Sequence, residues 1–119
     1  MARAKAVNMS GGTNWVRFTS TVVVGDKFKD IFNALVTLPD YGNCIKLVST
    51  RSNRLLYLCL GKPHNGSVEV VQDSVKDQDA IFVSIEGDEM LVKDMIVAIN
   101  NILSNHGFSL IDGEYEVSD

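Results

Sequence analysis

The spacing of hydrophobic residues predicts a strand followed by an amphipathic helix in the first third of the chain. Residues 15–24 are rich in aromatic and β-branched side chains, which is typical of a β-strand. Apolar side chains then recur at a helical spacing, on one side of a helix: Phe28, Ile31, Phe32 and Leu35. Pro39 limits this helix, because the residue before a proline avoids helical dihedral angles.

A run of short strands follows this helix. The strands are expected at residues 44–50, 54–60, 68–72 and 80–85. A turn at residues 51–53 joins the first two, and Asn65-Gly66 is a dipeptide that tight hairpin turns favour. Because the reversals between these strands are short, we expect the run to be antiparallel.

The clearest helical pattern lies near the C-terminus. Its apolar face comprises Leu91, Val92, Met95, Ile96, Ile99, Ile102 and Leu103. Asp88 suits the N-cap of this helix, and Gly107 suits the left-handed position just past its end, with Phe108 packing back. Residues 109–119 are expected to form a short strand or an acidic tail.

The order of elements is therefore strand, helix, four strands, helix and tail. It predicts an α+β fold, a mostly antiparallel sheet of about five to six strands with both amphipathic helices packed on one face. We expect a flexible basic arm at residues 1–13, a single domain at 14–108, and an acidic strand or tail at 109–119. A half-repeat of the TATA-box-binding protein has a similar element order, a likeness of order alone.

Composition indicates an ordinary globular domain. Hydrophobic residues make up 45% of the 119 residues and charged residues 22%. The longest purely apolar run is Leu55 to Leu60, which is too short to span a membrane. The first residues contain no apolar stretch of signal-peptide length. We expect an intracellular protein, cytoplasmic or nuclear, that has no membrane partner.

The formal net charge of −4 conceals two halves of opposite sign. Residues 1–62 carry nine basic and three acidic side chains, whereas residues 63–119 carry two basic and twelve acidic ones. Most of the positive charge falls on the arm, the start of the first helix and the first hairpin, and the negative charge falls on later loops, the start of the long helix and the tail. The pattern predicts a basic edge and an acidic edge on one small sheet.

If the loop of the first hairpin has an even number of residues, the sequence predicts a specific pairing of its strands. A turn centred between Arg51 and Ser52 pairs residues whose numbers sum to 103, which places Cys44 opposite Cys59. The favoured interpretation is that both cysteines are small buried hydrophobic groups, and a redox pair is the alternative.

This register also separates two faces of the hairpin. One face is wholly apolar and is assigned to the helices: Ile45, Leu47, Leu56, Leu58 and Leu60. The opposite face includes Lys46, Leu55 and Tyr57, and we expect it to be free of helices, together with Trp15, Arg17 and Phe82 from other strands. A face of this mixed character is too apolar to be fully solvated, so a partner is expected to cover part of it.

No motif in the chain indicates catalysis or a cofactor. Nucleotide-binding loops and hydrolase elbows are missing from the sequence. His64 is expected in a solvated turn, and His106 is expected to cap the end of the long helix. We therefore predict a protein that is not an enzyme and has no metal, cofactor or small-molecule substrate.

Two functions remain open. The first is a protein-interaction domain that self-associates, as a homodimer, through the helix-free sheet face or a sheet edge, using Trp15, Arg17, Lys46, Leu55, Tyr57 and Phe82. The alternative is a nucleic-acid-binding domain using the basic arm with Trp15, Arg17, Lys46, Arg51, Arg54, Tyr57 and Lys62. The interaction domain ranks first, because the acidic second half opposes binding of a polyanion.

Overall fold

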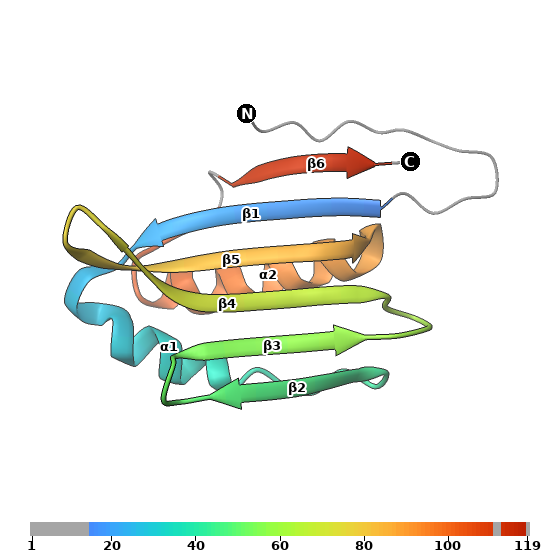
Figure 1. Ribbon diagram of the computed structural model, residues 1–119, viewed down its shortest axis with the longest axis horizontal. Helices are drawn as coiled ribbons and strands as arrows, with labels where there is room; N and C mark the ends of the chain where they lie inside the picture. Colours follow the sequence, from blue (N-terminus) through green and yellow to red (C-terminus); the bar gives the residue numbers. More distant parts are fainter. Residues whose placement is uncertain (1–14, 111–112, 119) are drawn as a thin grey trace.

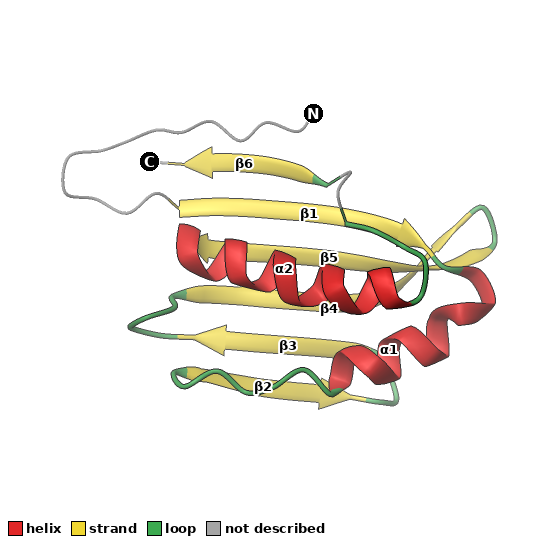
Figure 2. Cartoon of the chain, turned by 180° about the vertical axis from the view of Figure 1, so that it is seen from behind, coloured by secondary structure: helices red, strands yellow, loops and turns green. Residues whose placement is uncertain are grey.

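The computed structural model describes residues 15–110 and 113–118, and these residues form one sheet with two helices on a single face (Figures 1 and 2). The predicted arm at residues 1–13 lies outside the described residues. The elements are β1 (Trp15–Val23), a short 3₁₀ helix η1 (Gly25–Lys27), α1 (Phe28–Val36), β2 (Cys44–Ser49), β3 (Arg54–Cys59), β4 (Gly66–Val75), β5 (Gln78–Asp88), α2 (Glu89–Asn105) and β6 (Glu114–Ser118).

The six strands are antiparallel and lie in the order β2-β3-β4-β5-β1-β6. The predicted α+β fold class is confirmed, and the last segment contributes a strand. After β1, helix α1 carries the chain across one face of the sheet to its far edge, and the hairpin of β2 and β3 forms that edge (Figure 1). The two edge strands are β2 and β6.

The helices bury the faces that their sequences predict. In α1 the buried residues are Phe28, Ile31, Phe32 and Leu35, and in α2 they are Leu91, Val92, Met95, Ile99 and Leu103. Asp88 caps α2 by accepting a hydrogen bond from the Leu91 amide at 2.9 Å. The helix ends as expected, because Gly107 has a φ of 88° and the Phe108 amide bonds to the Leu103 carbonyl.

Among the described residues, neither helix has the length and apolar character needed to cross a membrane.

The tight hairpin turn lies elsewhere than predicted. Lys76 and Asp77 both have positive φ and form the two-residue loop between β4 and β5. Gly66 instead begins β4 against the backbone of β5, where an added Cβ would lie 2.1 Å from the Glu86 carbonyl oxygen. Glycine is thus required there for close approach of two strands. Strands β4 and β5 are longer than their apolar runs suggest.

His64 is buried, which corrects the prediction of a solvated turn residue. Its Nε2 lies 2.9 Å from the Asp94 carboxylate of α2, and its ring packs edge-on against Tyr41. Asn43 donates a hydrogen bond to the His64 carbonyl. These contacts fasten the loop between β3 and β4 to α2. His106 lies at the end of α2 with Nδ1 3.0 Å from the Ile102 carbonyl, as expected.

The predicted register of the first hairpin is confirmed, and Cys44 pairs with Cys59. The two cysteines are joined by a disulfide across β2 and β3. The favoured interpretation, that both cysteines are small buried hydrophobic groups, is therefore wrong, and the bond agrees with the alternative of a redox pair. The bond ties the edge strand of the sheet to its inner neighbour.

Candidate functional site

The face of the sheet that carries no helix changes character from one edge to the other. The strand registers place its side chains in rows that run across the sheet. One row is Leu47, Leu56, Glu69, Ser84, Thr19 and Glu114. The next row is Ile45, Leu58, Ser67, Glu86, Arg17 and Glu116. Each row starts with two aliphatic side chains on β2 and β3 and becomes polar or charged beyond them.

The aliphatic end of these rows is exposed to solvent. Ile45 is 61% exposed, Leu47 50%, Leu58 42%, and Leu60, just beyond β3, 80%. Leu56 is half-buried among them. We call these five residues the aliphatic patch. Contiguous apolar surface of this kind marks sites of interaction in soluble proteins.

The aliphatic patch lies on an edge strand, which has no strand partner on its outer side among the described residues. The Leu60 amide bonds to the Asn43 carbonyl, and residues of an antiparallel strand alternate between bonding to the partner and pointing away. The N–H and C=O groups of Lys46 and Val48 therefore point outward from the sheet. Proteins commonly protect such edges with charge or proline, and β2 contains one charge and no proline.

The single charge on β2 points away from the aliphatic patch. The Lys46 ammonium donates hydrogen bonds to the carbonyls of Val36 and Leu38, at 2.7 and 2.6 Å. The last carbonyls of a helix have no partner within the helix, and a cation there is favourable. Lys46 thus serves the end of α1, and it does not shield the outer edge of β2.

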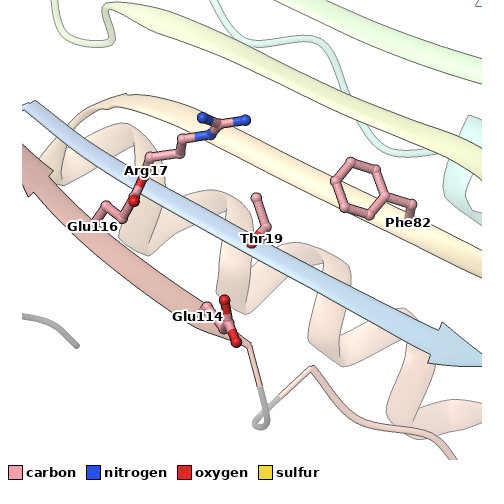
Figure 3. Close-up of a pocket in the computed structure, with 5 residues that line it drawn as sticks. All are labelled: Arg17, Thr19, Phe82, Glu114 and Glu116. Atoms are coloured by element: carbon pink, nitrogen blue, oxygen red, sulfur yellow. The ribbon is translucent and has the colours of Figure 1, made fainter. Parts of the chain in front are cut away.

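The opposite end of the helix-free face is polar. Arg17, Thr19, Phe82, Glu114 and Glu116 line a shallow depression of about 330 Å³ near β6 (Figure 3). The register places Arg17 between Glu86 on β5 and Glu116 on β6. Oppositely charged cross-strand neighbours compensate each other. The lining nevertheless holds two carboxylates and one guanidinium, so the depression has a net negative charge and lacks the positive excess that an anionic ligand requires.

The structure places half of the predicted partner-binding residues on the helix-free face. Trp15, Arg17 and Phe82 lie there, and the Trp15 indole donates to the Glu86 carboxylate at 2.9 Å. Lys46, Leu55 and Tyr57 lie on the opposite face, under the helices, where Leu55 and Tyr57 are fully buried. The assignment of the two hairpin faces was therefore wrong, although the register that separates them was right.

The physical reason is that the polar groups of the buried face have partners. Tyr57 packs its ring in the core and its hydroxyl donates to the Pro39 carbonyl at 3.0 Å. Lys46 reaches the end of α1 in the same way. The face with Lys46 and Tyr57 can pack under the helices because the end of α1 and the segment after it supply hydrogen-bond acceptors. The wholly apolar face of the hairpin is the one that is exposed to solvent. An assignment by polarity alone therefore placed the residues of the aliphatic patch under the helices, although they are exposed.

Burial also changes the acidity of two tyrosines beneath this hairpin. Burial raises the pKa of Tyr57 from 10.0 to about 12, with smaller contributions from Tyr41 and Asp40. Burial and the neighbouring Asp94 carboxylate raise the pKa of Tyr41. Both phenols are therefore neutral across the physiological range and act as packing and hydrogen-bonding groups.

The residues predicted for nucleic-acid binding are not gathered into one groove. Tyr57 is buried, and Trp15 and Arg17 lie at the β6 side with carboxylates beside them. Arg54 forms an ion pair with Glu69 on β4. Only Arg51 and Lys62 of this set are exposed near β2 without a contact that the described residues supply. Stacking platforms within a basic groove, which single strands require, are thus separated in space.

Comparison with known proteins identifies no relative of this chain. No protein-family model, curated protein or solved structure matches the chain.

Proposed function

We propose that the protein is a non-catalytic interaction domain that forms a homodimer through the aliphatic patch and the adjoining edge of β2. The observation that carries this proposal is the exposure of Ile45, Leu47, Leu58 and Leu60 on the helix-free face. Burying one such side chain contributes about 1.5–3 kcal/mol, so this surface favours association. We keep the predicted intracellular location as part of the proposal.

A second copy of the chain is the partner that this surface fits most simply. A two-fold contact brings the same patch of each subunit to the other, so apolar side chains of one copy contact apolar side chains of the second copy. The described part of the helix-free face has no comparable exposed apolar surface elsewhere, because the rows become charged toward β6.

Replacing Leu47 with aspartate is expected to disrupt the dimer. Leu47 is half-exposed, so the chain folds, but the carboxylate must lose water when the patches meet. Because the contact is two-fold, each substitution acts twice, and we expect the dissociation constant to rise on the order of 100-fold. Sedimentation velocity across a wide concentration range measures the change.

Val97→Asp provides the matched control. Val97 is 59% exposed on α2, on the opposite side of the sheet, and receives the same charge. This variant should dimerise like the wild type. A wild-type chain that sediments as a monomer at every concentration, or an equal loss from both variants, contradicts the proposed function.

Nucleic-acid binding stays a prediction and is not part of the proposal. The described residues bring Arg51 and Lys62 to the surface near β2, but they place no aromatic platform beside them. A titration with single-stranded and duplex oligonucleotides at low salt tests it.

A further inference from the structure

The proposed dimer leaves open how the two copies meet, because an aliphatic patch on an edge strand allows two geometries. The helix-free faces can stack on each other, or the two edges can join into one sheet. These geometries require different two-fold axes and bury different groups. The register, the hydrogen bonds and the charges around β2 distinguish them.

We infer that β2 of one copy pairs antiparallel with β2 of a second copy, about a two-fold axis at Lys46, so that the two sheets become continuous. This inference rests on the proposed function and names its geometry. Edge pairing of this kind supplies partners for main-chain groups that otherwise face water, and it draws affinity from backbone hydrogen bonds.

Main-chain groups define the register of this pairing. The outward-pointing residues of β2 are Lys46 and Val48, together with the carbonyl of Cys44. The Cys44 amide already donates to the Tyr41 carbonyl at 2.9 Å. An axis at Lys46 pairs Lys46 with its own copy, and it places the Val48 amide opposite the Cys44 carbonyl of the other chain. Each outward donor of β2 then has an acceptor.

The same register matches the side chains on the helix-free face. Antiparallel strands related by an axis normal to the sheet keep their faces on the same side. Ile45 therefore lies opposite Leu47 of the second copy, and aliphatic side chains pack across the axis on both sides. The patches of the two copies become contiguous, with Leu56 and Leu58 on the flanking strands.

The two lysines at the axis do not prevent this contact. Both Lys46 side chains lie on the helix-covered face, and each ammonium is held by two carbonyls of its own chain. Their charges are thus drawn toward the end of α1 in each subunit. The main chain of Lys46 remains available for pairing.

Charges beyond the ends of β2 favour the antiparallel arrangement. Asp40 precedes the strand and Arg51 follows it, and both side chains are exposed. An antiparallel pair brings the Arg51 end of one copy to the Asp40 end of the other, at both ends of the joint. Lys62 lies one strand further from the edge, on the loop after β3. The opposite signs at the two ends of one strand thus make the edge complementary to itself.

The other edge of the sheet is a poorer match. Glu114 and Glu116 lie on the same face of the outer strand β6, and both are exposed. Two β6 strands would place carboxylates together, which is unfavourable. A contact between β2 and β6 of the next copy would set the same carboxylates against Ile45 and Leu47, and it would not close into a dimer. Pairing of β2 with itself avoids both costs.

A proline at position 48 tests the inference, with Val48→Thr as the control. The Val48 amide points away from β3, so proline removes no hydrogen bond within the sheet but blocks addition of a strand at its edge. We expect the dissociation constant of Val48→Pro to rise on the order of 100-fold and that of Val48→Thr to stay near the wild-type value. Circular dichroism verifies that both variants fold.

Charge reversal provides a second test that does not depend on a backbone change. Arg51→Glu alone and Asp40→Lys alone should each weaken the dimer about tenfold, because like charges meet at both ends of the joint. The double variant should regain wild-type affinity. A dimer that keeps its affinity in Val48→Pro, with no rescue in the double reversal, overturns the edge geometry while the homodimer stands. Monomeric wild-type protein overturns the homodimer itself.

Discussion

Replacing Tyr57 with alanine is expected to lower the free energy of unfolding by about 3–5 kcal/mol, the cost typical of removing a buried aromatic ring. Tyr57 is fully buried beneath the hairpin, and its ring packs edge-on against Tyr41. Tyr57→Phe should lose only the hydroxyl contacts with the Leu38 and Pro39 carbonyls, at about 1 kcal/mol. Urea denaturation at a concentration where the chain is monomeric measures both, because dimerisation would add apparent stability.

The same residue predicts a loss of stability at alkaline pH. The folded protein holds the Tyr57 pKa at about 12, whereas the unfolded chain has the ordinary value of 10.0. Above pH 10 the unfolded chain releases this proton first, so stability is full below pH 10 and falls as pH rises toward 12. The wild type should therefore lose more stability over this window than Tyr57→Phe. Equal pH profiles for the two proteins contradict the burial of an ionisable group at this position.

Reducing the Cys44–Cys59 bond is expected to lower the free energy of unfolding by about 3 kcal/mol. The disulfide closes a loop with a sequence separation of 15, and cross-linking a loop of this size restricts the unfolded chain by that amount. Guanidinium denaturation of the oxidised protein, with and without a dithiol reductant, measures the difference.

A double variant, Cys44→Ser with Cys59→Ser, separates the bond from the reductant. It should match the reduced wild type and should not respond to the dithiol. Equal stability of the oxidised and reduced wild type would show that the bond contributes nothing. The proposed intracellular location would make the reduced form relevant as well, because reducing compartments keep most cysteines as thiols.

The periodicity of hydrophobic residues predicted most helices and strands, because it depends on the local sequence and not on contacts between distant segments. The stripes of α1 and α2 are buried as their spacing indicates, and the cap at Asp88 forms. The pairing of Cys44 with Cys59 follows from the even turn at residues 50–53. Strand order could not follow from these patterns, since it depends on where α1 carries the chain after β1.

The candidate site was mislocated for a reason that lies outside the hairpin. Within residues 44–60, the face with Lys46 and Tyr57 is the more polar one, and polarity alone assigns it to solvent. Its polar groups are satisfied by Val36, Leu38 and Pro39, which lie in another segment. His64 shows the same effect, since its partner Asp94 is 30 residues away. Buried polar residues are predictable only when their distant partners are known.

The charge split was informative in a different way. The two signs fall at opposite edges of the sheet, with Arg51 and Lys62 near β2 and with Glu114 and Glu116 on β6. Toward β6 the helix-free face has a net negative charge, because Arg17 lies between the carboxylates of Glu86 and Glu116. Net charge therefore says little about this protein, while the signs at the two ends of β2 bear on how copies meet.

Amide hydrogen exchange at Lys46 and Val48 tests the role of the β2 edge most directly. In the monomer these two amides point outward from the edge strand, so they should exchange rapidly at low protein concentration. At concentrations where the dimer forms, both should become protected, while amides of β6, at the opposite edge, keep their rates. Exchange at Lys46 and Val48 that stays unchanged while the protein dimerises would contradict a contact through β2.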